Sequence, residues 1–495
     1  MTYPCLSEAR KSYAQNIASA IGYSFRINTG FQDYKKYLIC ALCITLAPIV
    51  ASAELSKLDR DVREVIDRHA LTGKPLLAKK TATINDPLAQ LGKRLFFSMS
   101  LSGQEDTACV SCHHPLLGGG DNLSLSIGVN AIDPAVIGPG RRHSPKGFDF
   151  DGGPTVPRNA QTTFNTVFYN RCMFWDCRIE SLGATPGMNG QDNSIMRTPD
   201  TMWGMPASPA DSLLQAQAGF PVTAEDEMRA RFMRDAHGNE VREALAKRLR
   251  DKQEHWLQDF QIAFKSNRNA SELIVFENIS AAIAAYEESQ VFVDTPWKKY
   301  VAGNLQAIEQ NAKRGALLFY RDKAQGGVGC ARCHRGDLFS DENFYVMAVP
   351  QIGRGTEDGA REDHDYGRFL QTGNDEDRFA FRTPTLLNIE VTRPYGHNGA
   401  YEDLREMIRH MLNPIRAIAR YPFRLTQFDA NVINRHAREN TREVQKHFEQ
   451  LVKKNPGLVE MFDDNETQVE QLHAFLLSLT DPCVKNPVCM APWLE

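Results

Sequence analysis

Two copies of the motif Cys-x-x-Cys-His constrain this chain more than any other feature. The first copy runs from Cys109 to His113, and the second runs from Cys330 to His334. At this spacing two thiols can each add to one vinyl group of a haem, and the histidine that follows can reach the iron. The sequence therefore predicts two covalently bound haems. The attachment points would be Cys109, Cys112, Cys330 and Cys333, and the proximal iron ligands would be His113 and His334.

A structural zinc site is the alternative use of the same four cysteines. Two Cys-x-x-Cys pairs can form the four-thiolate set that zinc accepts. Such a site would leave both histidines unexplained, as well as the export signal described next. We therefore expect haem at both motifs.

The N-terminus has the pattern of an export signal. Two lysines at positions 35 and 36 precede an apolar run over residues 37–50, and residues 51–53 read Ala-Ser-Ala, the small-residue form of a cleavage site. We expect residues 1–53 to be an N-terminal extension with a signal peptide that is cleaved after Ala53. The mature protein would then be periplasmic, with an uncleaved N-terminal anchor as the alternative.

The cysteine count fits an exported protein. Three of the 11 cysteines lie in the predicted extension, and four more belong to the motifs. The remaining four form two close pairs, Cys172 with Cys177 and Cys483 with Cys489, which predict two local disulfides in an oxidising compartment. Free buried thiols are the alternative. The formal net charge of −4 argues against nucleic acid as a partner.

A weak internal repeat divides the mature chain. Residues 92–97 lead into the first motif and residues 315–320 lead into the second, and both segments begin with glycine and contain Leu-Phe. Further on, residues 158–165 correspond to residues 382–388. The repeat predicts two homologous haem domains, an N-terminal domain over residues 54–300 and a C-terminal domain over residues 301–495.

Helical periodicity dominates the mature chain. Apolar residues recur every three to four positions in six segments, and no run of alternating residues predicts a strand. Long loops rich in glycine and proline, at 130–157 and 183–212, suit segments that shape a site or wrap a cofactor. We expect a mostly α fold with long loops around the haems. The predicted helices are 240–264, 273–290, 304–321, 404–413, 430–453 and 467–479.

From about residue 85 to residue 480, the chain resembles the bacterial di-haem cytochrome c peroxidase and MauG family. The resemblance implies two cytochrome c-like domains, in which the N-terminal haem is the peroxide site and the C-terminal haem passes electrons to it. Besides the two haem motifs, it rests on residues 95–97, 118–122, 158–159, 164–165, 174–176, 227–228, 384–386, 394–399 and 475–480.

The resemblance also implies roles for residues outside the motifs. A tryptophan between the haems, here Trp175, would relay electrons, with simple packing as the alternative role. A glutamate followed by methionine, with a glutamine ten residues earlier, forms the distal acid–base group of the family, and Glu227 and Gln217 match it. A calcium ion would bind Asn159 and the backbone oxygens of Thr392 and Pro394.

Two positions distinguish the subtypes of this family. The peroxidases place a second histidine sixteen residues after the first proximal one, where this chain has Val129, whose side chain cannot bind iron. His143 is the alternative residue that could bind the iron of the N-terminal haem in place of that histidine. Fourteen residues beyond His397, where peroxidases have methionine and MauG has tyrosine, lies Met411, the expected second ligand of the C-terminal haem. The alternatives are a core position for Met411 and ligation by His410.

These features predict a periplasmic di-haem peroxidase with two haem c groups and one Ca²⁺. It would reduce hydrogen peroxide with electrons from a cytochrome c or a cupredoxin. One alternative, which Val129 favours, is a MauG-like enzyme that uses peroxide to oxidise Trp or Tyr residues of a partner protein. A plain electron carrier is a further alternative, but it conflicts with the free coordination position that Val129 implies at the N-terminal haem. The sequence is compatible with a homodimer.

Overall fold

The computed structural model describes residues 55–148, 150–183, 185–191, 196–202, 204, 210–423, 432, 435–457, 459–463 and 465–495, without the side chains of residues 253–255. Residues 55–495 form one unit by their contacts. The predicted extension and its cleavage site, residues 1–53, lie outside the described residues. Within the described part of the chain, none of the helices combines the length and the apolar composition needed to cross a membrane.

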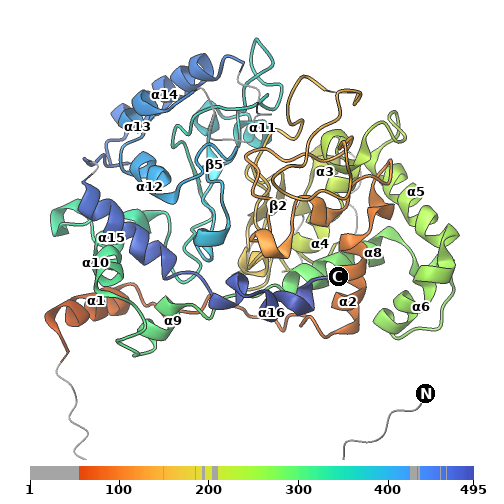
Figure 1. The fold of residues 1–495 in the computed structure, drawn as a ribbon, viewed down its shortest axis with the longest axis horizontal. Helices are drawn as coiled ribbons and strands as arrows, with labels where there is room; N and C mark the ends of the chain where they lie inside the picture. Colours follow the sequence, from red (N-terminus) through yellow and green to blue (C-terminus); the bar gives the residue numbers. More distant parts are fainter. Residues whose placement is uncertain are drawn as a thin grey trace, which may run out of the picture. The chain divides into compact units, whose positions relative to one another are not determined.

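Helices dominate the structure, as the sequence predicted (Figure 1). The helices described up to residue 301 are α1 (Lys57–Arg68), α2 (Pro87–Phe97), α3 (Pro199–Met202), α4 (Leu213–Gln217), α5 (Gly238–Asp251), α6 (Gln253–Phe264), α7 (Ala270–Leu273), α8 (Phe276–Glu288) and α9 (Pro296–Val301). Those that follow are α10 (Gln310–Tyr320), α11 (Phe369–Thr372), α12 (Leu404–Leu412), α13 (Pro414–Arg420), α14 (Ala437–Lys454), α15 (Glu466–Leu477) and α16 (Pro487–Met490).

In the described part of the chain, two small antiparallel sheets accompany the helices. One has the order β1 (Cys172–Met173), β2 (Ile179–Ser181) and β3 (Met196–Arg197), and the other pairs β4 (Phe344–Tyr345) with β5 (Phe381–Arg382). Each strand has only two or three residues, which is too short for a pattern of alternating residues to appear in the sequence.

Three predicted helices differ markedly in extent from the observed ones, and the one predicted from residue 304 begins only at Gln310. The segment 240–264 is two helices, because Lys252 leaves helical geometry at φ −95° and ψ 29° between α5 and α6. The helix predicted from residue 430 begins at Ala437, and most of the residues just before it lie outside the described part of the chain.

The same helix crossing precedes each haem motif. A side-chain carbon on Gly92 of α2 would lie 1.8 Å from the Ala282 carbonyl oxygen of α8. One on Gly315 of α10 would lie 1.9 Å from the Gln471 carbonyl oxygen of α15. Only glycine allows backbones to approach this closely. The glycines that begin the sequence repeat are therefore the contact points of two equivalent helix pairs.

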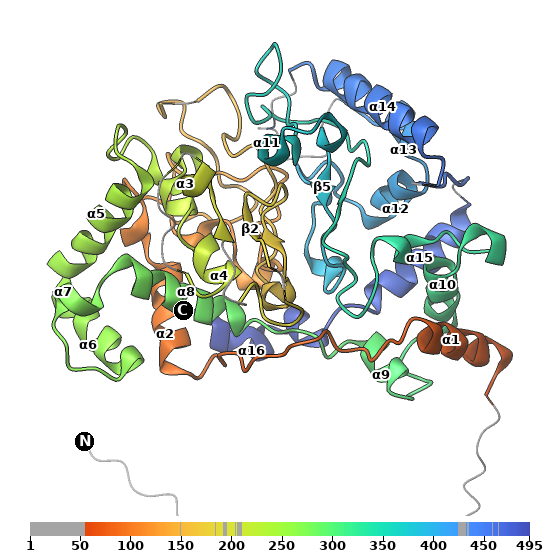
Figure 2. The same cartoon turned by 180° about the vertical axis from the view of Figure 1, so that it is seen from behind.

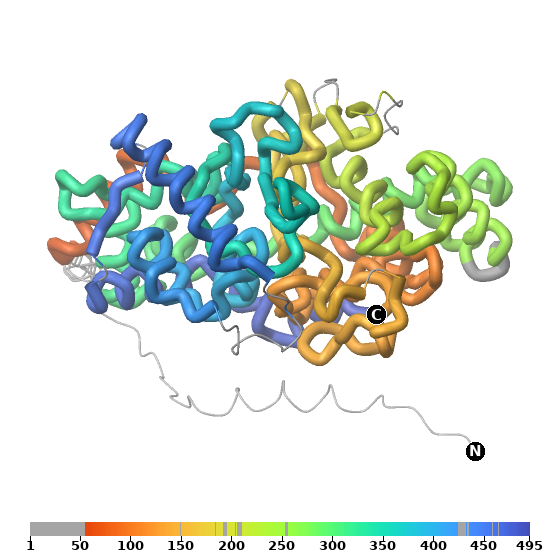
Figure 3. Tube along the Cα trace, turned by 90° about the horizontal axis from the view of Figure 1, so that it is seen from above, coloured from red at the N-terminus to blue at the C-terminus, as the bar shows by residue number. Residues whose placement is uncertain are grey.

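The two helix pairs lie in separate apolar clusters. The first cluster joins α2, α5, α6 and α8, and its fully buried members include Leu95, Leu245 and Phe260. The second joins α1, α9, α10, α12 and α15 through residues such as Trp297 and Phe475. From above, cyan and blue segments of the second half gather on one side, and orange, yellow and light green segments gather on the other (Figure 3).

Each end of the described chain packs against the opposite half (Figures 1 and 2). Asp59 of α1 accepts hydrogen bonds from the Tyr300 hydroxyl at 2.8 Å and from Lys313 Nζ of α10 at 2.7 Å. At the other end, the Trp493 carbonyl accepts from the Tyr286 hydroxyl of α8 at 2.7 Å. These contacts join residues of the first half of the sequence to residues of the second half.

Candidate active site

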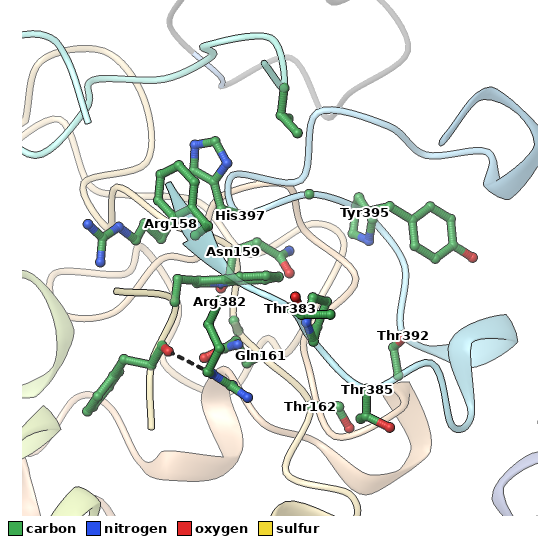
Figure 4. A pocket seen from close by; sticks show the side chains of 18 of the residues that line it. Arg158, Asn159, Gln161, Thr162, Arg382, Thr383, Thr385, Thr392, Tyr395 and His397 are labelled. Atoms are coloured by element: carbon green, nitrogen blue, oxygen red, sulfur yellow. Dashed lines mark hydrogen bonds between the residues drawn. The ribbon is translucent and has the colours of Figure 1, made fainter. Parts of the chain in front are cut away.

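A single cavity of about 500 Å³ is lined by residues from both haem motifs. Figure 4 shows part of its wall, including residues of the first half such as Asn159 and residues of the second half such as Thr392. Every residue to which the sequence assigned a haem, metal or catalytic role lines this cavity. These residues are Cys109, Cys112, His113, Asn159, Trp175, Gln217, Glu227, Cys330, Cys333, His334, Thr392, Pro394 and Met411.

Both motifs begin with a single turn of 3₁₀ helix, which brings cysteine and histidine together. The turns span Cys109–Ser111 and Cys330–Arg332. Each histidine uses Nδ1 to donate a hydrogen bond to a backbone carbonyl, His113 to Gly119 at 3.2 Å and His334 to Phe339 at 2.9 Å. Burial lowers the pKa of both rings. A neutral imidazole oriented through Nδ1 presents Nε2 to a metal, as a haem iron ligand must.

The cysteines divide as the haem assignment requires. The pairs Cys172–Cys177 and Cys483–Cys489 form disulfides, which confirms the predicted pairing. The four motif cysteines form none. Among the described residues, no group of three or more His, Cys, Asp or Glu side chains could hold a metal ion, so the zinc alternative lacks a ligand set.

Polar atoms in the wall also suit a bound haem. Arg382 Nη1, His397 Nε2 and Ser126 Oγ are buried cavity-lining atoms that have no hydrogen-bond partner within the described structure. Buried donors of this kind are costly unless something pairs with them. The propionate groups of a haem are acceptors that could do so. The cysteines, the oriented histidines and these unsatisfied atoms together fit haem c.

Glu227 lies beside Arg178 in the part of the cavity that the first motif lines. It belongs to a single π-helical turn, Glu225–Arg229, and Arg178 Nη2 lies 3.4 Å from its Oε1. Burial, together with the neighbouring Glu227 carboxylate, raises the pKa of Asp226 to about 7. Gln217, the last residue of α4, lines the same cavity. The arrangement can hold and move a proton.

Val129 packs against the turn that carries Glu227. It is fully buried, and its backbone N–H donates to the Asp226 carbonyl at 3.4 Å. Among the described residues that line the cavity, neither Val129 nor His143 appears. The buried His143 ring stacks on Phe150 at 5.6 Å between centroids, and its Nδ1 donates to the Ser144 carbonyl at 3.0 Å.

Trp175 is held by hydrogen bonds to both halves of the sequence. Its indole N–H donates to the Asn159 carbonyl at 3.0 Å, and its own carbonyl accepts from the Arg382 N–H of β5 at 2.9 Å. Asn159 in turn donates its backbone N–H to the His397 carbonyl at 2.8 Å. The ring therefore lies in the wall where residues of the first and second halves meet.

A buried ion network lies next to Trp175. Arg158 contacts Asp176 at 2.8 Å and Asp365 at 2.7 Å, and all three side chains are at least nine-tenths buried. Burial alone would raise the pKa of Asp365, but the Arg158 guanidinium outweighs it and lowers the pKa to about 2. Arg158 and Asp176 belong to the first half of the sequence and Asp365 belongs to the second. The network therefore ties the two halves together.

Met411 lines the cavity from α12, and the neighbouring His410 does not. Both ring nitrogens of the buried His410 are engaged, Nδ1 with the Tyr401 hydroxyl and Nε2 with the Met347 carbonyl, each at 2.8 Å. Burial lowers the pKa of His410 to about 4. Of the two candidates for the second iron ligand, Met411 is the one whose side chain reaches the cavity wall.

Several charged or titratable residues of this wall received no role from the sequence, among them Arg178, Arg382, His397 and Glu287. Arg178 directly follows the disulfide-bonded Cys177, and Arg382 and His397 lie in segments that were noted without a role. Glu287 lines the cavity from α8, and burial raises its pKa to about 8. A glutamate four residues after Ile283, on the buried face of a helix, is the signal that could have identified it.

Comparisons with known proteins identify relatives of this chain. The family model described as di-haem cytochrome c peroxidase matches residues 86–306. A cytochrome c peroxidase of Denitromonas iodatirespirans is 31% identical over 356 residues, which are 68% of this chain and 72% of that protein. The methylamine utilization protein MauG of Methylorubrum extorquens is 25% identical over 322 residues, 65% of this chain and 67% of that protein.

A solved structure supports the fold. The crystal structure of a MauG-like protein associated with microbial copper homeostasis matches with a TM-score of 0.53 and 22% identity, over 83% of this chain and 95% of that one. The paired haem motifs, the fold and the sequence relatives lead to one assignment. The chain is an oxidoreductase that belongs to the di-haem cytochrome c peroxidase and MauG family.

Proposed function

We propose that this chain is a periplasmic di-haem peroxidase that reduces hydrogen peroxide to water with electrons from a small redox protein. The cavity that both Cys-x-x-Cys-His motifs line, together with Glu227 and Trp175, is the observation that carries this proposal. Each peroxide needs two electrons and two protons to become two waters. When bound, the two haems supply the redox centres, and the chain must supply the proton transfer and the path between them.

Glu227 is the group we assign to proton transfer. Its carboxylate would take the proton from one peroxide oxygen and return it to the oxygen that leaves as water. Arg178, 3.4 Å away, orients the carboxylate, and the Gln217 amide would hold the peroxide by a hydrogen bond. Both side chains belong to residues that line the same cavity, which supports this assignment.

Trp175 is the residue we assign to electron relay. Its indole lies in a wall that both motifs share, and hydrogen bonds to Asn159 and Arg382 hold its two ends. His334 and Met411 would bind the C-terminal haem iron, and a thioether ligand raises the potential of a haem, as suits the entry point for electrons. Residue Val129 has no lone pair for iron, so peroxide would react at the N-terminal haem without prior reduction.

A calcium ion is a further part of the proposal. Asn159 donates its Nδ2 to the Leu123 carbonyl at 2.9 Å, so its Oδ1 is the atom that would bind the cation. The backbone oxygens of Thr392 and Pro394 would complete the protein ligands, and oxygen donors suit a hard cation. Metal analysis before and after dialysis against EGTA tests the site, and a protein without calcium that keeps full activity would contradict it.

Steady-state turnover tests the peroxidase proposal. Purified holoenzyme should oxidise ferrocytochrome c or a reduced cupredoxin only when hydrogen peroxide is present, two donor molecules per peroxide. The mature N-terminus should be Glu54, which Edman sequencing of the periplasmic fraction would show. A holoenzyme with two haems that leaves every donor reduced would contradict the proposal.

A MauG-like activity is the second candidate, and Val129 is the observation that favours it. The family resemblance places a blocking histidine there in peroxidases, and a permanently open site would suit oxidation of a partner protein. Co-expressed candidate partner proteins would be treated with the holoenzyme and hydrogen peroxide. Mass spectrometry would then reveal oxidised Trp or Tyr residues in them. Such a product, formed faster than ferrocytochrome c is consumed, would favour this candidate.

A further inference from the structure

The Cys172–Cys177 disulfide closes a short loop that contains Trp175. The two cysteines are five positions apart, and each is at least 99% buried. Between them lie only Met173, Phe174, Trp175 and Asp176. Nothing in the proposed function uses this cross-link, although it encloses the residue assigned to electron relay.

The loop has a backbone that ordinary side chains rarely adopt. Phe174 has φ +69° and Cys177 has φ +55°, both in the left-handed region. An aromatic residue is uncommon in that region, and such strain persists only where the surrounding structure imposes it. The disulfide spans both strained positions. It therefore restrains the part of the backbone that would otherwise relax.

Contacts on both sides hold the residues that the loop presents. Asp176 is bound by Arg158, and the Arg178 guanidinium lies 4.0 Å from the centre of the Phe174 ring. The Phe174 carbonyl accepts a hydrogen bond from Arg382 Nε at 3.3 Å. The loop thus lies between residues of the first half and strand β5 of the second half, with Trp175 in its middle.

We propose that the Cys172–Cys177 disulfide is a positioning element that holds the Trp175 indole in place for electron transfer between the two haems. This inference rests on the relay role proposed for Trp175. At each step Trp175 would pass one electron from the C-terminal haem, when bound, to the N-terminal haem after hydrogen peroxide has oxidised it, so the C-terminal haem loses the electron that the N-terminal haem gains. The donor protein replaces that electron, and two such transfers accompany each peroxide. Misplacement of a group by about 1 Å can cost roughly 10²-fold in rate.

The test compares two disulfides in the intact holoenzyme. The variant C172S/C177S removes the loop cross-link, and C483S/C489S removes the other disulfide, whose cysteines do not belong to the cavity lining described above. The enzyme is first reduced at its C-terminal haem and then mixed with peroxide in a stopped-flow instrument. We expect transfer between the haems to slow at least tenfold in C172S/C177S and less than twofold in the control. Haem content and the peroxide reaction of the diferric enzyme should change less than twofold in both.

A crystal structure of C172S/C177S gives a readout that does not depend on activity. We expect the indole to lose its 3.0 Å hydrogen bond to the Asn159 carbonyl. If this variant fails to fold, C172S/C177G replaces it, because glycine accepts φ +55° without strain while the cross-link is still absent. An indole that keeps its place, or transfer within twofold of wild type, would overturn the proposal.

Trp175→Phe separates this inference from the function on which it rests. Slow transfer in Trp175→Phe, with no further slowing when C172S/C177S is added, would support both. Slow transfer in Trp175→Phe but normal transfer in C172S/C177S would overturn the role of the disulfide and leave the relay intact. Normal transfer in Trp175→Phe would overturn the relay and, with it, the role of the disulfide.

Discussion

Replacing Arg158 by alanine should destabilise the protein strongly, because it leaves two buried carboxylates without their partner. Arg158 contacts Asp176 at 2.8 Å and Asp365 at 2.7 Å, with at most 8% of any of these side chains exposed. The pKa of Asp365 falls from 3.8 to about 2, which corresponds to about 2 kcal/mol of stability at neutral pH. Removing one member of a buried ion pair costs about 3–5 kcal/mol. We expect a loss of about 3–5 kcal/mol for Arg158→Ala.

Guanidinium unfolding of the holoenzyme, followed by haem absorbance, measures this loss. Lys247→Ala is the matched control, because Lys247 pairs with Asp251 at 2.7 Å on the surface and such pairs contribute less than about 1 kcal/mol. The triple variant Arg158→Met, Asp176→Asn, Asp365→Asn should recover most of the stability, since it removes the uncompensated charge together with the arginine.

The pH dependence of this effect has a defined sign. Since the pKa of Asp365 is lower in the folded protein than its ordinary value of 3.8, its contribution is complete above about pH 4 and is lost as the pH falls toward 2. The gap between wild type and Arg158→Ala should therefore narrow across that window. A loss below about 1 kcal/mol at pH 7, or a triple variant no more stable than Arg158→Ala, would refute the reasoning.

Three further predictions concern the haems. Met411→Ala should convert the C-terminal haem from low to high spin, whereas the neighbouring cavity residue Met407→Ala should not; an unchanged ferric spectrum in Met411→Ala would exclude Met411 as the ligand. Glu227→Gln should slow the reaction with peroxide by about 10²-fold in stopped-flow measurements, and a loss below threefold would move the proton-transfer role to another residue. Diferric electron paramagnetic resonance should show one high-spin and one low-spin haem, and two low-spin signals that disappear only when His143 is replaced would contradict an open site at Val129.

The features that the sequence could reveal are those written in local patterns. The two haem motifs, the close cysteine pairs and the longer helices each occupy a short segment with a recognisable spacing. The glycines at 92 and 315 marked the repeat in the sequence. The structure shows why they are glycines, because each lies at the contact point of one of two equivalent helix crossings.

Contacts between distant residues could not be predicted in the same way. Arg158 and Asp365 are 207 positions apart, and nothing in either segment marks an ion pair. The left-handed conformation of Phe174 also has no sequence signal, because aromatic residues seldom adopt it. Tertiary packing, rather than local preference, determines both features. The arrangement of residues around Trp175 therefore could not be predicted from the sequence.

The central claim, a di-haem enzyme whose oxidised form is open to peroxide, is tested most directly by sequential-mixing stopped-flow spectroscopy. The diferric holoenzyme is mixed first with one equivalent of hydrogen peroxide and then with ferrocytochrome c. We predict a haem absorbance change at the first mixing, without prior reduction, and its reversal at the second as two ferrocytochrome c molecules are oxidised. A diferric enzyme whose spectrum changes only after reduction, or a peroxide product that ferrocytochrome c does not consume, would contradict the claim.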